Sequence, residues 1–427
     1  MPERIKVGLV NQPWGYVEPP ITKGGSIPIL LYETARRLTD EFDVAFFTRG
    51  GFRRQTKLES GIHFEYIPVA VDKALIRLQG KVKVLPESKL RPFWATDWFH
   101  PQYGRRLGVR SRELGCDIVH ITNYTQFIQP VRQHNPNARI VMHMHCEWAN
   151  QLDRAMVEPR LRQADMILGC SNFICQRIKE AFPDLADRCR PCWNGVYLDR
   201  FHPTDHAQRM QIRRILFVGR VAPEKGVHIL IEGFAMLAKA NPELRLDIVG
   251  PGEIIPLDMQ VTICDDPEVK KLSPFYAGDE YRRHLEDLVA RYGLGDRVTF
   301  HGPVGHADGL VELYQRADVA VIPSIWDEPF GIPVVEAMAS GLPVVVTNVG
   351  AFPEIVDNGT YGMVINRADS AAIAGAIQSL MDDPGLRRRL TIEGRERAIT
   401  HFSWDGVVNQ LKTYYRELVS TPALAQG

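Results

Sequence analysis

The sequence predicts an α/β protein made of two doubly wound, Rossmann-like domains that face a central cleft. Short buried runs rich in β-branched residues alternate with amphipathic helical patterns, which is typical of βαβ units around a parallel sheet. The alternation stops in the turn-rich segment 194–209 and then starts again. At 427 residues, the chain is also longer than one ordinary domain, so two domains of about 200 residues each are expected.

The first domain is expected to cover residues 1–205. Its predicted strands are apolar over most of their length instead of alternating, which favours strands buried on both faces of a parallel sheet. These strands are 4–10, 43–48, 117–122, 138–145 and 165–170, and apolar residues at helical spacing predict a helix over 26–40.

The second domain is expected to cover residues 206–402 and to repeat the same architecture. Its predicted strands are 213–220, 244–250, 297–302, 319–324 and 342–347, with a helix over 226–240 after the first of them. An amphipathic pattern follows once this second sheet is complete. It predicts a final helix within 403–427, which we expect to pack back on the first domain.

The overall composition gives no reason to expect nucleic acid as a partner. Lys plus Arg and Asp plus Glu number 51 each, and 45% of the residues are apolar, as in a globular protein. The chain has no uncharged apolar run of about 18 residues that could span a bilayer. Its first residues lack the long apolar segment of a signal peptide. We therefore expect a cytoplasmic protein.

The cysteines are expected to be buried thiols. Seven cysteines in a long chain of this kind argue against a disulfide framework. We weighed a structural zinc site among Cys170, Cys175, Cys189 and Cys192, but only the last pair has the Cys-x-x-Cys spacing of zinc ligands. No metal is expected.

Positive charge is concentrated in the segment 73–112. It holds ten Lys or Arg residues against two acidic ones. Five aromatic residues are interleaved with these charges: Phe93, Trp94, Trp98, Phe99 and Tyr103. Two interpretations stay open. The segment could contact an anionic acceptor or the head groups of a membrane surface, or it could be a solvated region whose aromatic side chains enter the core.

The loop after the first strand of the second domain has the residues of an anion site. Gly219 ends the strand, Arg220 and Lys225 lie on the loop, and a helix begins near Gly226. A helix N-terminus and two cations attract an anion together, and a guanidinium can bind two phosphate oxygens at once. The spacing is neither that of a P-loop nor that of a dinucleotide fingerprint, because the nearest candidate, "GPGEII", lacks its third glycine.

Two carboxylates surround the start of a helix in "EPFGIPVVEAMASGLPVV". Pro333 suits the first turn and Gly341 the end of this helix. The pattern therefore predicts Glu336 in the first turn and Glu328 on the loop before it. Carboxylates repel phosphate but accept hydrogen bonds from hydroxyls. A diphosphate flanked by two polyols, which is a nucleotide sugar, would suit both the cations and the acids, although helix-dipole complementation alone could explain Glu336.

With these residues in view, the chain resembles the retaining glycosyltransferases of family 4, which have the GT-B fold. The resemblance covers nearly the whole chain and rests on separate pieces of sequence. They are "EPFGIPVVEAMASGLPVV" at 328–345, "VGRVAPEKG" at 218–226, "NGVYLDRFHP" at 194–203, "FSW" at 402–404 and "KGGS" at 23–26.

The resemblance implies a role for each matching residue. In the donor site, Glu336 would bind the ribose, Glu328 the transferred sugar, and Arg220 with Lys225 the diphosphate. Backbone amides of Phe330 and Gly331, and of Gly24 and Gly25, would assist, and His145 would be the active-site histidine of the first domain. Taken alone, a histidine at a strand end is more often structural.

The resemblance also implies retention of configuration. No divalent metal is expected to be required, because the sequence has no Asp-x-Asp triplet and Arg220 and Lys225 could neutralise the leaving diphosphate. One departure from the family pattern affects specificity. Family members usually pass from the "LDIVGPGEI" strand directly to a helix, whereas about 25 residues near 254–280 intervene here. This insertion is expected near the donor pocket, where it puts the identity of the sugar and base in doubt.

The sequence favours an enzyme that transfers a sugar from a nucleotide diphosphate to a carbohydrate, lipid-linked or small-molecule acceptor. Two alternatives stay open. A nonhydrolysing nucleotide-sugar epimerase would share the fold and the ligand. A non-enzymatic protein that only binds nucleotide sugars would also keep the same residues, although the intact set of Arg220, Lys225, Glu328 and Glu336 argues against it.

Overall fold

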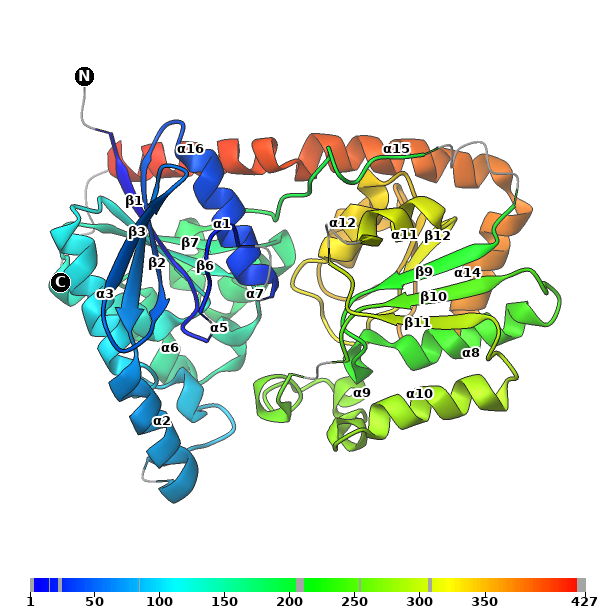
Figure 1. The fold of residues 1–427 in the computed structure, drawn as a ribbon, viewed down its shortest axis with the longest axis horizontal. Helices are drawn as coiled ribbons and strands as arrows, with labels where there is room; N and C mark the ends of the chain where they lie inside the picture. Colours follow the sequence, from blue (N-terminus) through cyan, green and yellow to red (C-terminus); the bar gives the residue numbers. More distant parts are fainter. Residues whose placement is uncertain are drawn as a thin grey trace. The chain divides into compact units, whose positions relative to one another are not determined.

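The computed structural model describes residues 4–14, 16–21, 25–83, 85–204, 211–252, 255–305 and 309–420. The chain divides into two compact units (Figure 1). Unit 1 comprises Met1–Gly195 and Trp404–Gly427, and unit 2 comprises Val196–Ser403. Both are α/β structures built on a largely parallel sheet, as the sequence predicts.

Unit 1 contains an eight-stranded sheet in the order β3-β4-β2-β1-β5-β6-β7-β8. Only β3 runs antiparallel to its neighbour. The strands are β1 (Lys6–Val10), β2 (Asp43–Gly50), β3 (Gln55–Glu59), β4 (Ile62–Pro68), β5 (Ile118–Thr122), β6 (Arg139–Met144), β7 (Met166–Gly169) and β8 (Cys189–Pro191). The five predicted strands are confirmed. The sequence analysis missed β3, whose residues are mostly exposed, and β8, which has three residues. It also missed β4.

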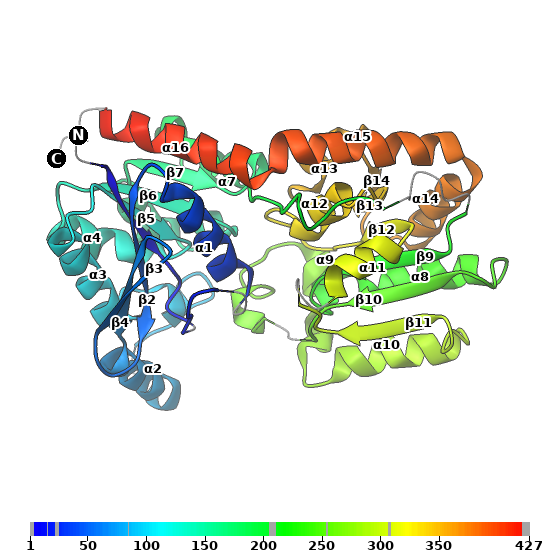
Figure 2. The ribbon, with the colours of Figure 1, turned by 45° about the horizontal axis from the view of Figure 1, so that its top comes forward.

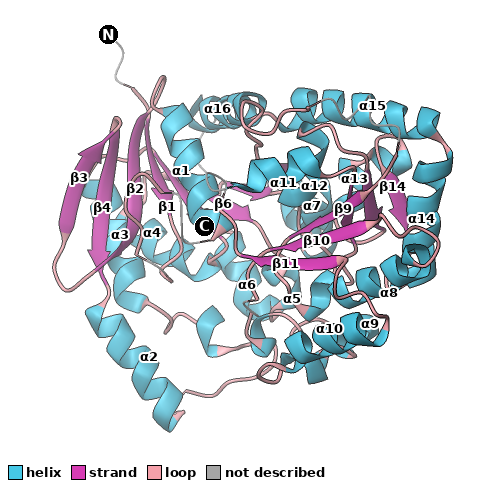
Figure 3. Ribbon diagram, turned by 45° about the vertical axis from the view of Figure 1, so that its right-hand side comes forward, coloured by secondary structure: helices cyan, strands magenta, loops and turns pink. Residues whose placement is uncertain are grey.

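The helices of unit 1 cover the sheet (Figure 3). They are α1 (Ser26–Leu38), α2 (Ala70–Val82), α3 (Pro101–Glu113), α4 (Ile128–His134), α5 (Trp148–Gln151), α6 (Arg154–Leu161), α7 (Asn172–Ala181) and the final helix α16 (Trp404–Ser420). Helix α16 lies beside α1 (Figure 2). Its Lys412 forms an ion pair of 2.6 Å with Asp40, just after α1. Apolar residues on its inner face, such as Val408 and Leu411, are buried.

The division between the units differs in place from the predicted boundary near residue 205. Val196 pairs with Ser403 in a parallel bridge, and its amide donates to the carbonyl of Phe402 at 2.8 Å. Phe201 is fully buried and meets the ring of Tyr314 edge-on. The apolar side chains of this turn-rich segment therefore pack in unit 2, and the boundary between the units lies at Val196 instead of near residue 205.

Unit 2 contains a six-stranded parallel sheet in the order β11-β10-β9-β12-β13-β14. The strands are β9 (Arg214–Val218), β10 (Arg245–Val249), β11 (Val298–Gly302), β12 (Val319–Ile322), β13 (Val344–Thr347) and β14 (Met363–Ile365). Five were predicted, and β14 was missed because it has three residues. The order reverses between β9 and β12, and ligands of doubly wound sheets bind at the carboxyl ends of the strands beside this switch point.

The helices of unit 2 pack on both faces of its sheet and enclose a core of aliphatic side chains. Three aromatic side chains join this core, one each from β9, α8 and α10: Phe217, Phe234 and Tyr281. They are α8 (Val227–Ala238), α9 (Pro267–Lys270), α10 (Glu280–Arg291), α11 (Val311–Arg316), α12 (Ile332–Ala339), α13 (Phe352–Ile355), α14 (Ser370–Asp382) and α15 (Pro384–Phe402). The insertion between β10 and α10 forms short elements: the 3-10 turns Leu257–Met259 and Ser273–Tyr276, with α9 between them.

The cysteines and the lengths of the apolar helices can be compared with what the composition predicts. All seven cysteines lie in the described part of the chain, and none of them forms a disulfide. Cys170, Cys175, Cys189 and Cys192 are buried, as predicted. Among the described residues, no helix is both long and apolar enough to cross a bilayer.

The aromatic residues of segment 73–112 mostly enter the core of unit 1. Trp94, Phe99 and Tyr103 are buried, whereas Trp98 is 58% exposed. The Tyr103 hydroxyl donates to the carbonyl of Asn11 at 3.0 Å, beyond the end of β1. For most of its aromatic side chains, the segment therefore follows the second of the two interpretations.

Candidate functional site

Three residues of unit 2 that are predicted to bind the nucleotide-sugar donor lie on loops at the switch point of its sheet. One loop follows β9 and carries Arg220 and Lys225, and the other follows β12 and carries Glu328. Gly226 allows the two loops to touch: its φ is +69°, and a Cβ atom there would lie 2.0 Å from the carbonyl oxygen of Pro323. A larger residue at 226 would therefore push the loops apart.

Lys225 and Glu328 form a direct ion pair, with 2.6 Å between Nζ and Oε1. The hydroxyl of Ser324 donates to the same carboxylate oxygen, and the ammonium lies 5.0 Å from the centre of the Trp326 ring. Glu328 is 7% exposed. From the sequence, these two residues are assigned to different parts of the donor, whereas in the structure they contact each other directly.

Arg220 is held by a carboxylate that the sequence analysis did not single out. Its guanidinium donates to Oε1 of Glu224 at 2.6 Å, and the hydroxyl of Tyr276 donates to Oε2 of the same residue at 2.7 Å. Burial acts to raise the pKa of Glu224, but the positive charges of Arg220 and Lys225 outweigh it and lower that pKa below its ordinary value. Glu224 is therefore an ionised, fully buried carboxylate.

Helix α12 carries Glu336, but in its second turn and not in the first. The helix begins at Ile332, one residue before the proline, so the predicted place of Glu336 in the first turn is wrong. The side chain of Glu336 is buried and accepts a hydrogen bond of 2.9 Å from the hydroxyl of Tyr314. Burial raises its pKa from 4.5 to about 8, although the Tyr314 bond opposes this shift.

The chain before α12 presents backbone donors. Gly331 has a φ of +143°, and a Cβ atom there would lie 2.6 Å from the ring of Phe352. Within the described residues, the amides of Phe330 and Gly331 donate no backbone hydrogen bond. They precede the first helical residue, where unpaired amides can bind a ligand oxygen. At the other end of the helix, Gly341 has a φ of +73°, as its predicted position at the helix end requires.

The remaining predicted residues belong to unit 1. Its strand order reverses between β1 and β5, so its own switch point lies at the ends of these strands. Gly25 begins α1 with a φ of +89°, while Gly24 lies outside the described residues. His145 follows β6, the neighbour of β5. Its backbone amide donates to Oδ1 of Asn123 at 2.7 Å, and Asn123 itself has a left-handed φ of +62°.

A row of histidines extends from α16 to His145, in which His120 and His143 are buried and His145 is half-buried. The Tyr415 hydroxyl lies 2.6 Å from Nδ1 of His120, and Nε2 of His120 lies 3.2 Å from Nδ1 of His143. The His143 and His145 rings have their centres 4.1 Å apart. Burial lowers the pKa of His120 to about 3 and that of His145 to about 4. These imidazoles are therefore neutral near pH 7.

The Tyr415 hydroxyl sets the arrangement of protons along the row. Burial raises the pKa of Tyr415 well above its ordinary value, so the phenol keeps its proton, and a buried donor without an acceptor is costly. Tyr415 therefore donates to Nδ1 of His120. His120 then donates from Nε2 to Nδ1 of His143, which places the proton of His143 on Nε2. Among the described residues, this Nε2 has no hydrogen-bond partner. These rings, with Trp193 and Asn194, line a small pocket between α1 and α16.

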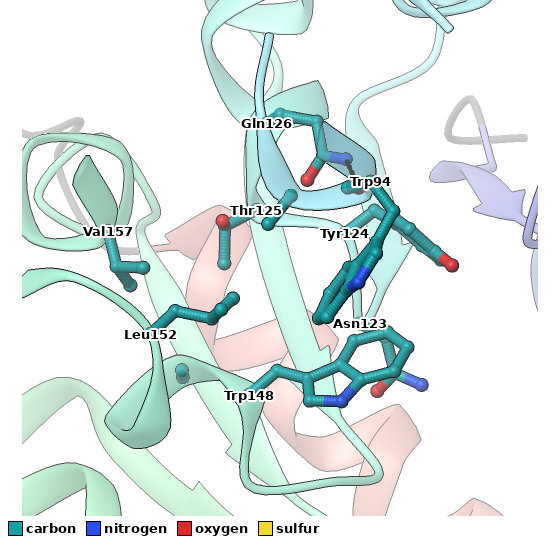
Figure 4. A pocket seen from close by; sticks show the side chains of 10 residues that line it. Trp94, Asn123, Tyr124, Thr125, Gln126, Trp148, Leu152 and Val157 are labelled. Atoms are coloured by element: carbon teal, nitrogen blue, oxygen red, sulfur yellow. Dashed lines mark hydrogen bonds between the residues drawn. The ribbon is translucent and has the colours of Figure 1, made fainter. Parts of the chain in front are cut away.

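A second pocket of unit 1 lies beside Asn123 (Figure 4). Its wall is aromatic: the rings of Trp94 and Trp148 have their centres 4.5 Å apart, and Tyr124 meets Trp148 edge-on. Asn123 belongs to this wall and also to the contact with His145. The sequence analysis did not identify Asn123, because its role depends on a loop conformation that no motif encodes.

Comparison with known proteins gives matches over most of the chain. The family model described as "Glycosyl transferases group 1" matches residues 200–397, and the model "Glycosyltransferase Family 4" matches residues 28–200. D-inositol 3-phosphate glycosyltransferase from Salinispora tropica is 27% identical over 94% of this chain and 83% of its own length.

Solved structures of the same fold cover nearly the whole chain. Sucrose-phosphate synthase from Thermosynechococcus elongatus superimposes with a TM-score of 0.71 at 24% identity, covering 97% of this chain and 99% of its own. HepE from Anabaena, solved in complex with UDP and glucose, gives a TM-score of 0.68 at 16% identity, over 96% of this chain and 99% of its own.

Proposed function

Because the chain belongs to glycosyltransferase family 4 and has the GT-B fold, we propose that it transfers a sugar from a nucleotide diphosphate to a carbohydrate or other hydroxyl-bearing acceptor. One observation carries this proposal. Two cations and a carboxylate, Arg220, Lys225 and Glu328, converge on the switch point of unit 2, and Lys225 touches Glu328 directly. Cations there suit a diphosphate, and carboxylates suit the hydroxyls on either side of it.

We propose a role in donor binding for each of these groups. Arg220 and Lys225 bind the diphosphate, assisted by the amides of Phe330 and Gly331. Glu328 accepts hydrogen bonds from the transferred sugar, and Glu336 accepts them from the ribose. A UDP-sugar is the first donor to test, since HepE, which shares the fold, was solved with UDP and glucose.

We further propose retention of configuration without a metal ion. A double-displacement mechanism needs a carboxylate that is available to attack the anomeric carbon. Glu328 is instead engaged by Lys225 and Ser324, which supports hydroxyl binding. The acceptor attacks on the face from which the diphosphate leaves, and a diphosphate oxygen takes its proton. Arg220 and Lys225 stabilise the departing charge, while the neutral His145 orients the sugar or the acceptor.

The stereochemistry of the product tests this mechanism. UDP-, GDP- and ADP-sugars are first screened for thermal stabilisation, because a ligand of the native state raises the melting temperature. The working donor is then incubated with acceptors, with and without EDTA, and the new glycosidic bond is examined by NMR. We expect an α-linked product from an α-linked donor, unaffected by EDTA. A β-linked product, or activity restored only by Mn²⁺ or Mg²⁺, would contradict the proposal.

The same assay separates transfer from the two alternatives. An epimerase would invert C2 of the nucleotide sugar in the absence of any acceptor. A protein that only binds nucleotide sugars would be stabilised by the donor but would show no turnover with any acceptor.

Contact with a membrane surface is a separate proposal, and it is favoured by α2, which overlaps the beginning of segment 73–112. Val71, Leu78 and Val82 share one face of this helix, by their spacing, and are 53%, 51% and 62% exposed. Exposed cations accompany them: Lys73, Arg77, Lys81 and Lys83. The acid of the helix, Asp72, is buried and accepts hydrogen bonds from the amides of Gln102 and Tyr103. A basic, amphipathic surface of this kind suits anionic lipid.

Sedimentation with liposomes tests the membrane proposal. We expect binding to anionic but not to neutral vesicles, weakened by salt, and lost in Leu78→Ser/Val82→Ser. Met236→Ser is the control, since Met236 is 54% exposed on α8 of unit 2. Equal binding by both variants, or no binding at low salt, would leave α2 as a solvated face.

A further inference from the structure

The insertion between β10 and α10 contacts both loops of the proposed donor site. Its Tyr276 reaches Glu224 on the β9 loop. Its Asp266 pairs with Arg367, whose guanidinium also donates to the carbonyl of Ile325 on the β12 loop at 3.0 Å. Neither contact could be expected from the family's motifs, because the insertion is a departure from them.

The contact of Tyr276 is part of the arrangement that holds Arg220. Glu224 has no exposed surface, and each of its carboxylate oxygens has its own donor. Arg220 donates to Oε1 at 2.6 Å and Tyr276 to Oε2 at 2.7 Å. With one oxygen fixed by the tyrosine, the carboxylate plane is fixed as well, and so is the direction from which the guanidinium must approach.

The backbone of Glu224 is also tied to the second loop. The amide of Ile325 donates to the carbonyl of Glu224 at 2.8 Å. Hydrogen bonds and one ion pair therefore form a continuous network from Tyr276 through Glu224 and Ile325 to Arg367 and Asp266. Asp266 is in turn fixed as the N-cap of α9, where it accepts from the amide of Glu268 at 2.9 Å. Both ends of the network lie in the insertion.

We propose that Tyr276 is a positioning residue for the donor, which holds Glu224 so that Arg220 meets the diphosphate in one orientation. This inference rests on the proposed function, in which Arg220 binds the diphosphate. Loss of the tyrosine hydroxyl leaves one oxygen of a buried carboxylate without its donor and lets the carboxylate turn. Arg220 then has to be ordered when the donor binds, and that ordering costs affinity.

The raised pKa of Tyr276 suits a hydroxyl group that always donates its hydrogen bond to Glu224. Burial and the neighbouring carboxylate of Glu224 raise the pKa of Tyr276 well above its ordinary value. The hydroxyl therefore keeps its proton over the whole working pH range of an enzyme, so its effect on Arg220 does not switch with pH.

The experiment compares Tyr276→Phe, Arg220→Ala and the double variant with the wild type, all as the full-length chain. Tyr276→Phe keeps the ring, and we expect it to raise the KM for the donor and the Kd for UDP about five- to tenfold, with the acceptor KM unchanged. In the Arg220→Ala background the same substitution is expected to have no further effect on UDP binding. Tyr292→Phe, at a 43% exposed tyrosine of unit 2, is the control.

The outcomes separate the inference from the function on which it rests. Wild-type UDP binding by Arg220→Ala would remove the proposed diphosphate site itself. If Arg220→Ala weakens binding but Tyr276→Phe matches the control, Tyr276 does not position Arg220. A penalty from Tyr276→Phe that persists without Arg220 would show a general effect on the fold and overturn the inference. All measurements are made well below the melting temperature of the least stable variant.

Discussion

At the scale of single residues, each proposed diphosphate cation is paired with a carboxylate. Arg220 is paired with Glu224, and Lys225 with Glu328. These partners fix the cations without removing their ability to bind, because an ammonium has three donors and a guanidinium five. The donor therefore meets groups that are already oriented, which lowers the cost of ordering them on binding.

The first prediction concerns these two cations. We expect Arg220→Ala and Lys225→Ala each to weaken UDP binding by about 1.5–3 kcal/mol, since each removes a charge-assisted contact. Titration calorimetry with UDP and the donor dependence of kcat/KM measure the effect. Lys239→Ala, at an exposed lysine just after α8, serves as the control. A wild-type kcat/KM in either variant, with every donor that works, would remove that residue from the diphosphate site.

The second prediction follows from the raised pKa of Glu336. With a pKa of about 8, Glu336 is mostly protonated at pH 7, whereas a carboxylate that accepts from ribose hydroxyls must be ionised. Donor binding at pH 7 is therefore expected to release a proton and to strengthen as the pH rises toward 8. Calorimetry in buffers of different ionisation enthalpy measures that proton. Glu336→Gln should bind UDP more weakly and release none.

The same pKa has a consequence for stability. Between pH 4.5 and about 8 the folded protein holds a proton on Glu336 that the unfolded chain has lost, so the free energy of unfolding falls as the pH rises through this range. Glu336→Gln is expected to reduce that fall. An equal slope in the variant and the wild type, measured by urea unfolding at several pH values, would contradict a raised pKa at this residue.

At the scale of elements, α16 contributes a side chain to the interior of unit 1 next to its candidate site. Tyr415 is fully buried on this helix and lies at the far end of the histidine row from His145. Helix α16 therefore sets the protonation pattern of His120 on β5 and of His143 on β6.

The third prediction tests this arrangement. Tyr415→Phe removes the donor to His120, and we expect it to lower the free energy of unfolding by about 1 kcal/mol and to change the tautomer of His143. Nitrogen-15 NMR of the imidazoles reports the tautomer. Tyr414→Phe is a matched control, because Tyr414 donates to the carbonyl of Pro191 at 3.2 Å and does not touch the row. Unchanged imidazole shifts in Tyr415→Phe would exclude this arrangement of protons along the histidine row.

Strands and helices could be predicted where burial leaves a strong pattern. Strands such as β1 and β13 are apolar over most of their length, and the helical spacing of α1 is clear. Edge strands were missed because β3 is polar and exposed, and β8 and β14 have three residues each. Pro333 marked the beginning of α12 only to within a residue. That single residue moves Glu336 from the first turn to the second.

At the scale of the whole molecule, the chain enters unit 2 at Val196 and returns to unit 1 at Trp404. The last helix thus completes the unit in which the chain began. Trp404, Val407 and Leu411 are buried in unit 1, and burial of large apolar side chains contributes about 1.5–3 kcal/mol each.

The fourth prediction follows from this path. Truncation before Trp404 removes only residues that belong to unit 1, so we expect unit 1 to become sensitive to protease while unit 2 still binds UDP. Glycosyl transfer is expected to be lost. Limited proteolysis with mass spectrometry and UDP titration of the truncated chain provide the measurements. Loss of UDP binding together with unit 1 would mean that unit 2 depends on this helix as well.

The sequence by itself determined the two-domain α/β architecture, the family, and the identity of Arg220, Lys225, Glu328 and Glu336 as candidates for the donor site. It could do so because buried strands and glycine- or proline-bounded turns leave local patterns. The tertiary structure alone decided which groups touch. The pairing of Lys225 with Glu328, the support of Arg220 by Glu224 and Tyr276, and the row from Tyr415 to His145 all join side chains from separate elements. Such contacts depend on how strands and loops are brought together in space, and burial then decides the charge state of each group, as it does for Glu336.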